Sequence, residues 1–240
     1  MLDMLLCHAY AWNHNAIYGG SCGEPTKLHK THERLLESVG LLTELPFQCP
    51  KHHNDTTTRR KTIPRSVFQK EDTQLWNPGY VDYLKRHVVR YPIKTSPFTI
   101  AVHIRRGKFS PCAGTVQGYD PYLPNAHYQR LIDKYMQPNA RVVIFSQKKS
   151  FESFDAFQKQ QNYEVYLDED ITHVWKTMLV ADVVIQSRSS FSLIPAVVSK
   201  GTVVYTPFWH APLEGWDVVD DDLLQHTHHE MSVLREQKCP

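Results

Sequence analysis

Two short polar segments carry the residue types best suited to binding an anion. The first, VHIRRGKF at 102–109, runs from an apolar stretch directly into Arg105 and Arg106. The second, SRSSFS at 187–192, brings serine hydroxyls and Arg188 to the predicted start of a helix. Guanidinium groups bind phosphate oxygens through paired hydrogen bonds, and a helix N-terminus offers free backbone N–H groups with a partial positive charge. Together the two segments predict a cradle for a diphosphate.

Each segment by itself also has a simpler interpretation. A pair of arginines is often a solvated surface feature, and a serine-rich run before a helix is often only a cap. His103, which lies inside the first segment, fits a buried core histidine as well as a ligand contact. We favour a binding site because both segments follow predicted strands of one sheet.

Strands and helices alternate through the second half of the chain with short connections. This alternation predicts an α/β domain with a doubly wound parallel sheet. Ligands bind outside the carboxyl ends of the strands in such sheets, so the segments after three of the strands are expected to face one crevice. The predicted strands are 98–104, 141–145, 163–167, 183–186 and 202–205, and the predicted helices are 125–136 (capped by Asn125), 171–180 and 189–199, with an amphipathic stretch at 150–160.

The first half of the chain is less regular. Its patterns predict helices at 2–13, 29–42 and 77–89, a turn-rich loop at 18–25 and a polar loop at 51–61. We expect two α/β lobes, an N-terminal lobe at 1–95 and a C-terminal lobe at 96–240. A helix that begins at Met1 leaves no room for a preceding strand, so a small, truncated N-terminal lobe is one expectation.

Composition excludes several function classes. With 27 Lys and Arg against 25 Asp and Glu, the net charge of +2 argues against a nucleic-acid partner bound through bulk charge. No run approaches the ~18–20 apolar residues of a membrane span. Any membrane association is therefore expected only through a segment outside this chain.

Metal-binding patterns are also missing from the sequence. The five cysteines fit no zinc motif, and the 14 histidines include no H-E-x-x-H pattern, so we expect no metal. LDED at 167–170 is the nearest acidic candidate, but its acids are more simply partners of a helix N-terminus. Disulfides are an option in an oxidising lumen, although the sequence does not give their pairing.

Several motifs resemble those of a known family. VHIRRGK is similar to the H-x-R-R-G-D motif of the fucosyltransferase superfamily that makes α1,2-, α1,6- and O-linked fucosides. LPNAHYQRLIDKY at 123–135 resembles the segment that follows this motif in the α1,2-type members, and the stretch at 180–205 resembles their last motif. The opening residues 1–20 resemble their first helix more loosely. The chain is therefore identified as a divergent relative of this superfamily.

The resemblance implies a GT-B-like fold of two facing Rossmann-type lobes, with 1–95 as the acceptor-side lobe and 96–240 as the nucleotide-sugar-binding lobe. It also implies metal-independent transfer, with inversion at the anomeric carbon, from a GDP-sugar held by the C-terminal lobe to a glycan or glycoprotein acceptor. No cofactor is implied besides this donor substrate. The implied compartment is the Golgi lumen for an anchored eukaryotic enzyme and the cytoplasm otherwise. By position, Arg105 and Arg106 would be the catalytic residues that hold the diphosphate, with Arg105 more critical. His103 would touch the nucleoside, and Ser189, Ser190 and Phe191 would lie on the phosphates and ribose, with Ser187 as a further donor-binding candidate.

Three positions depart from the family pattern. Lys108 replaces the acid of the first motif and could add a phosphate contact. Ser146, in the segment 146–148, stands where the family usually has an acidic residue. His173 and Val174 stand where an acid is expected to read guanine. Lys108, Ser146 and His173 are therefore donor-side candidates, and another nucleotide sugar in place of GDP-fucose stays open.

The acceptor side is less defined. His14, Glu24 and His29 are candidates for the general base that takes the proton of the acceptor hydroxyl, and the sequence does not choose among them. Aromatic faces suit sugar rings, but the aromatic loop after the last strand fits packing against its own domain equally well; it contains Trp209, His210 and Trp216. Two further hypotheses remain: a non-catalytic nucleotide- or glycan-binding relative, and a phosphate-binding enzyme such as a phosphatase or sulfotransferase.

Overall fold

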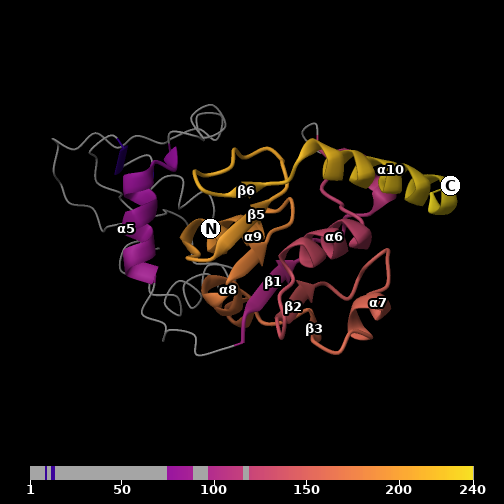
Figure 1. Ribbon diagram of the computed structural model, residues 1–240. Coiled ribbons are helices and arrows are strands. Elements are labelled where there is room, and N and C mark those ends of the chain that lie inside the picture. Colours follow the sequence, from indigo (N-terminus) through magenta and orange to yellow (C-terminus); the bar gives the residue numbers. More distant parts are fainter. Residues whose placement is uncertain (1–8, 10–11, 14–74, 89–96, 116–118, 240) are drawn as a thin grey trace, which may run out of the picture. The chain divides into compact units, whose positions relative to one another are not determined.

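The computed structural model describes residues 9, 12–13, 75–88, 97–115 and 119–239 (Figure 1). The chain divides into two compact units, 1–90 and 91–240. In the first unit, α5 spans Pro78–Val88, close to the predicted 77–89. Asn77 caps it, because its Oδ1 accepts a hydrogen bond of 2.9 Å from the backbone N–H of Tyr80. Apart from helical residues 9, 12 and 13, the predictions for 1–74 lie outside the described residues.

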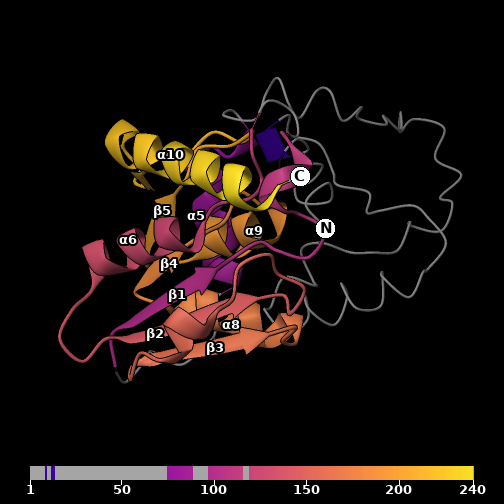
Figure 2. The same cartoon turned by 90° about the vertical axis from the view of Figure 1, so that its right-hand side faces the viewer.

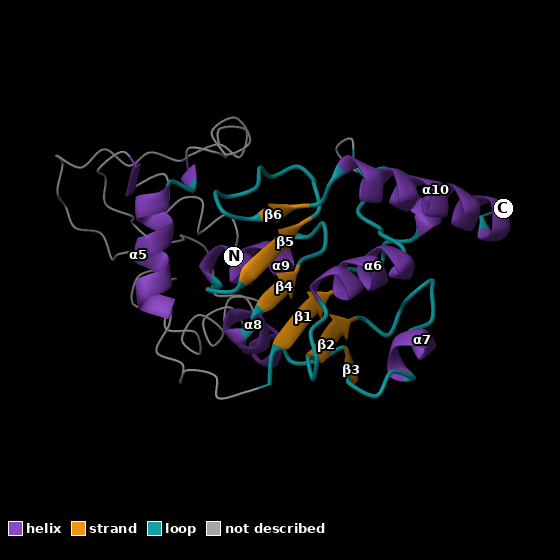
Figure 3. Ribbon diagram, in the orientation of Figure 1, coloured by secondary structure: helices purple, strands orange, loops and turns teal. Residues whose placement is uncertain are grey.

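The second unit is an α/β domain built on an open sheet of six parallel strands (Figures 1 and 3). The strand order β3-β2-β1-β4-β5-β6 is consistent with a Rossmann-like fold. The central strand β1 is buried along its whole length, as expected of a parallel strand that is covered on both faces. The strands are β1 (Thr99–His103), β2 (Arg141–Ser146), β3 (Tyr163–Leu167), β4 (Val183–Ile185), β5 (Thr202–Tyr205) and β6 (Asp217–Val218).

Helices cover both faces of this sheet. Figure 2 shows α6 and α10 on one face and α8 and α9 on the other, in agreement with the contacts of α6 with β1, of α10 with α6 and of α8 with α9. The helices are α6 (Asn125–Tyr135), α7 (Asp155–Gln158), α8 (Ile171–Val180), α9 (Ser190–Val198) and α10 (Asp221–Lys238), with a short 3₁₀ turn, η1, at Pro111–Ala113.

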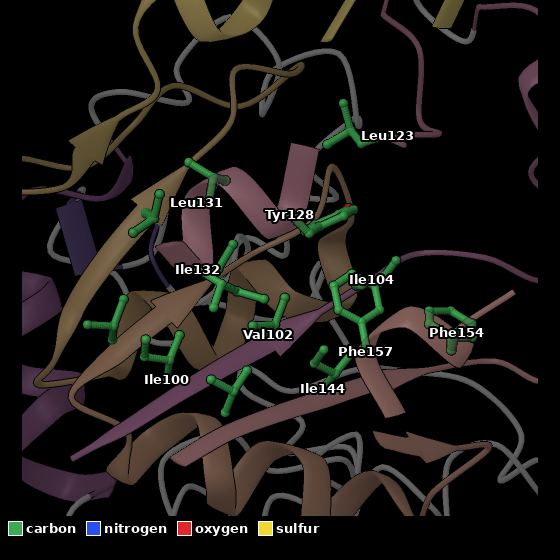
Figure 4. Close-up of a cluster of buried hydrophobic side chains, with 14 of the residues drawn as sticks. Ile100, Val102, Ile104, Leu123, Tyr128, Leu131, Ile132, Ile144, Phe154 and Phe157 are labelled. Atoms are coloured by element: carbon green, nitrogen blue, oxygen red, sulfur yellow. The ribbon is translucent and has the colours of Figure 1, made fainter. Parts of the chain in front are cut away.

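Side chains along β1 alternate between the two faces of the sheet. Ile100 and Val102 join the hydrophobic core with Leu131 and Ile132 of α6 (Figure 4). By the two-residue period of a strand, His103 faces the opposite side, where its ring lies 4.8 Å from that of Phe191 in α9. The end of β1 thus carries one polar side chain toward α9.

The strand order creates a topological switch point between β1 and β4. From β1 the chain continues outward to β2 and β3, and it then returns to place β4 on the other side of β1. The connections from these two strands run through α6 and α9, on opposite faces of the sheet (Figure 2), and ligands of open α/β sheets bind at such a switch point. Both anion-binding segments of the sequence begin at this point.

Most predicted elements of this unit are present within a residue or two of their expected bounds. One local expectation is wrong: the N-cap position of α6 is Pro124, and Asn125 is its first helical residue. Its amide oxygen does not cap the helix because it accepts a hydrogen bond from Arg106 instead. The sequence patterns do not predict α10 or β6.

One disulfide, Cys112–Cys239, joins residues 127 positions apart in the sequence. It connects η1 to the residue that follows α10. Arg235 strengthens this connection, since its Nε donates to the carbonyl of Pro111 at 2.8 Å and its Nη2 pairs with Asp120. The loop that follows Arg105 and Arg106 is thereby fixed to the last helix. None of the described helices is long and apolar enough to cross a membrane.

Candidate functional site at the carboxyl ends of β1 and β4

Arg105 is the cation presented at the end of β1. Its side chain is partly exposed, and its Cζ lies 5.2 Å from the ring centroid of Phe109. Partial burial lowers the pKa of Arg105, yet a guanidinium of such high ordinary pKa stays charged at neutral pH. In the part of the chain that the structure describes, Arg105 forms no ion pair. This side chain is therefore a candidate anion ligand.

Arg106 differs from the expectation that both guanidinium groups face a ligand. Its side chain is completely buried on the α6 side of the sheet. Nη2 donates to Asn125 Oδ1 at 2.6 Å and Nη1 donates to the carbonyl of Arg105 at 3.0 Å. Its Cζ lies 4.2 Å from the ring centroid of Tyr122. We interpret Arg106 as a positioning residue, because it holds the backbone of Arg105 in place.

Glu152, in the loop after β2, is the carboxylate that compensates Arg106. The two side chains approach to 3.5 Å. Glu152 Oε2 also accepts hydrogen bonds from the hydroxyl of Tyr122 at 2.6 Å and from the backbone N–H of Asn125 at 3.1 Å. A negative charge at this N-terminus of α6 is favourable. One carboxylate thus connects the helix start with the arginine loop, a contact that no local sequence pattern indicates.

His103 joins the two anion-binding segments. Its Nδ1 lies 2.7 Å from the hydroxyl oxygen of Ser187, the first residue of the second segment. Burial, helped by the charges of Arg105 and Arg106, lowers the pKa of His103 to about 3, so its ring is neutral at pH 7. With 3% of its surface exposed and a partner inside the protein, His103 fits the core-histidine interpretation. It fixes the distance between the ends of β1 and β4.

The serines after β4 form the cap of α9, and part of this segment stays accessible to solvent. Ser189 is the N-cap, and its Oγ accepts from the backbone N–H of Phe191 at 3.3 Å. Ser192 is buried, and its hydroxyl turns back to the carbonyls of Ser187 and Ser189. Ser189, Ser190 and Phe191 remain partly exposed. The helix-cap interpretation is confirmed, and the segment still presents hydroxyls beside the switch point.

Arg188 is a further cation at this point, and the sequence alone assigns it no individual role. It is only 8% exposed, and burial lowers its pKa. Its Nη1 donates to the backbone carbonyl of Asp120 at 2.9 Å. Its Nε has no hydrogen-bond partner, and it forms no ion pair with any described residue. The sequence pattern that points to Arg188 is the same as for Arg105: an arginine directly after a buried strand.

The remaining donor-side candidates occupy different surroundings. Ser146 is buried, and its hydroxyl donates to the carbonyl of Ile104 at 2.8 Å, so it fixes the loop after β1. Lys108 is exposed, with its Nζ 5.3 Å from the ring centroid of Phe109. His173, on α8, lies 3.5 Å from Glu169 and is half-exposed. The general-base candidates, His14, Glu24 and His29, lie outside the described residues.

The aromatic loop after β5 packs largely on its own domain. The ring of Trp216 lies 5.8 Å from that of Tyr205, and the rings of Trp209 and His210 lie 3.4 Å apart. The hydroxyl of Tyr205 donates to the carbonyl of buried His210. These contacts favour the packing interpretation.

The acidic segment at 167–170 begins a helix. Asp170 is the N-cap of α8, and its Oδ1 accepts from the backbone N–H of Thr172 at 2.9 Å. Across the described ranges, no three His, Cys, Asp or Glu side chains are grouped closely enough to hold a metal ion.

Comparisons with known proteins return no match: no family model, no curated protein and no solved structure resembles this chain significantly. The class of the second unit is therefore defined by its own fold, an α/β domain with an open, all-parallel six-stranded sheet flanked by helices. Its candidate site is a cationic switch point between β1 and β4.

Proposed function

We propose that this chain is an inverting, metal-independent glycosyltransferase of GT-B-like architecture. It would move a sugar, with L-fucose from GDP-fucose as the first candidate, to a hydroxyl of a glycan or glycoprotein. The observation that supports this proposal is the meeting of the two family-like segments at adjacent strand ends. His103 Nδ1 and Ser187 Oγ, which belong to the two segments, lie 2.7 Å apart.

The proposed chemistry uses fixed positive charge. As the glycosidic bond breaks, negative charge develops on the departing nucleoside diphosphate, and donors already aimed at that charge stabilise the transition state. Arg105 would provide the charge at β1. Ser189, Ser190 and the start of α9 would provide hydroxyl and backbone donors at β4. The acceptor hydroxyl would lose its proton to a base from the N-terminal lobe.

A non-catalytic relative that binds a nucleotide or a glycan is the second candidate. Three expected ligand contacts make bonds inside the protein: Arg106 to Asn125, Ser146 to Ile104, and His103 to Ser187. The acid of the first motif is replaced by exposed Lys108. A fold that keeps these residues for structure would retain binding without turnover.

Titration calorimetry with a panel of nucleoside diphosphates tests the shared binding step. GDP binding that weakens ~10-fold or more in Arg105→Ala, with a matched Lys85→Ala control unchanged, supports the site. Release of GDP from GDP-fucose, in the presence or absence of glycan acceptors, then separates a transferase from a binder. Binding of inorganic phosphate or sulfate with no nucleotide binding would contradict both and favour a phosphate-directed enzyme of another class.

A further inference from the structure

Buried hydrogen-bond donors without partners gather on the α6 side of the switch point. Arg106 Nε and Arg188 Nε are inaccessible to solvent and have no hydrogen-bond partner, and the buried hydroxyl of Tyr128 lies in the same region. Tyr128 lies on α6, and the Cζ of Arg106 is 6.0 Å from its ring centroid. Burial raises the pKa of Tyr128 to about 12, and the positive charges of Arg106 and Arg188 act against this rise. These three groups therefore share one region.

The carboxylates close to this region are already committed. Glu152 accepts from the hydroxyl of Tyr122 and compensates Arg106. The carboxylate of Asp120 accepts from the backbone N–H of Tyr122 at 3.0 Å and pairs with Arg235. Among the described residues, Arg188 has one hydrogen-bond acceptor, the neutral carbonyl of Asp120, for a guanidinium with five N–H donors. The negative charge of the Asp120 carboxylate also acts on Arg188, but this carboxylate is shared with Arg235.

A buried arginine that shares its carboxylate with a second arginine is only partly compensated. Removing a guanidinium from water carries a large free-energy penalty that an anion must offset. Water could accept a hydrogen bond from Nε, but it would add no negative charge beside the carboxylate that Arg188 and Arg235 share. An anion that accepts hydrogen bonds would supply both.

We propose that Arg188 is a second phosphate-binding arginine at the switch point, acting with Arg105 on one phosphate-class anion. The two residues follow neighbouring parallel strands, β1 and β4, and neither forms an ion pair with a described residue. Arg188 lies directly before Ser189, the N-cap of α9. The inference rests on the proposed anion site and not on sugar transfer, so the two can fail separately.

The sign of the stability change distinguishes a binding role from a structural role. Arg188→Met removes a buried charge that shares the Asp120 carboxylate with Arg235, and it keeps most of the side-chain volume. We expect urea unfolding in anion-poor buffer to give a midpoint equal to or higher than that of the native chain. Titration with inorganic pyrophosphate at fixed ionic strength should show a dissociation constant at least ~10-fold higher, since a charge-assisted hydrogen bond is lost. Arg188→Lys, which keeps the charge but not the fork of donors, should also bind more weakly than the native chain.

Arg130→Met is the matched control. Arg130 also has an unpartnered Nε, but its other nitrogens pair with Glu230 on α10. This variant should lose stability slightly and bind pyrophosphate within about two-fold of the native chain.

Each outcome decides the inference. Arg188→Met that binds pyrophosphate like the native chain, that unfolds at a lower urea midpoint or that does not fold would overturn it, as would a native chain that does not bind pyrophosphate. Nucleotide binding that depends on Arg105 but not on Arg188 would refute the inference and leave the proposed function standing. Pyrophosphate binding that depends on Arg188, with no nucleoside diphosphate bound, would support the inference and refute the proposed function.

Discussion

Removing the carboxylate of Glu152 should destabilise the second unit strongly, because it leaves a fully buried arginine without its ion-pair partner. Arg106 is 0% exposed and lies 3.5 Å from Glu152, whose side chain is 17% exposed. Breaking a buried pair from one side costs about 3–5 kcal/mol. Glu152→Ala also removes the acceptor of two further hydrogen bonds, from Tyr122 and from Asn125. We expect a loss of about 3–5 kcal/mol, which for a chain of this length lowers the melting temperature by roughly 6–20 °C.

A double-mutant cycle separates the charge effect from the packing effect. Arg106→Met removes the buried cation, so Glu152→Ala should cost much less in that background, with a coupling of about 2–3 kcal/mol. The measurement is urea unfolding of the native chain, both single variants and the double variant. Anion affinity should fall in Glu152→Ala as well, because Arg106 holds the carbonyl of Arg105.

An exposed pair provides the control for this cycle. Arg141 and Glu164 form a two-fold hydrogen-bonded pair, but their side chains are 39% and 40% exposed. Glu164→Ala should therefore cost only about 0–1 kcal/mol. The prediction is wrong if Glu152→Ala lowers the free energy of unfolding no more than Glu164→Ala does. It is also wrong if the free-energy changes of the single variants at 106 and 152 are additive.

Two further predictions concern pH and redox conditions. Burial lowers the pKa of His103 and of His127 to about 3 in the folded protein, against 6.5 when unfolded, so the unfolded chain takes up protons first as pH falls. Folding stability should therefore decrease from pH 7 to pH 5, by about 2 kcal/mol for each histidine, and His103→Gln should flatten the slope of unfolding free energy against pH. Reduction of Cys112–Cys239 should lower stability by about 2–5 kcal/mol. The double variant Cys112→Ser with Cys239→Ser should melt like the reduced protein and show no further response to a reductant, whereas equal melting of oxidised and reduced protein would contradict a stabilising role.

Local sequence patterns determined most elements of the parallel sheet. The apolar run at 98–104 has the composition of a strand buried on both faces, and β1 occupies 99–103 of it. Asp170 and Ser189 start their helices as short polar side chains do, by accepting a backbone N–H. These outcomes depend on neighbours within a few residues, which is why the sequence alone predicts them.

The missed helix α10 illustrates the limit of such patterns. Most of its surface is polar, and its buried residues are only Thr227 and Met231, so its apolar periodicity is weak. Contacts with α6 and the disulfide at Cys239 hold it in place. Tertiary partners, and not local preference, decided that this segment packs on the sheet domain.

The sequence by itself determined that arginines and serines follow parallel strands of one sheet, because strand pattern and short connections fix which ends share an edge. That β1 and β4 are neighbours was decided by the strand order of the folded domain. The sequence also did not determine which arginine is available to a ligand. Arg105 remains partly exposed and Arg106 is enclosed by Asn125 and Glu152, which lie 19 and 46 positions further along the chain (125 − 106 and 152 − 106). Burial and charge compensation are properties of the assembled fold, since they depend on which distant side chains arrive beside each guanidinium group.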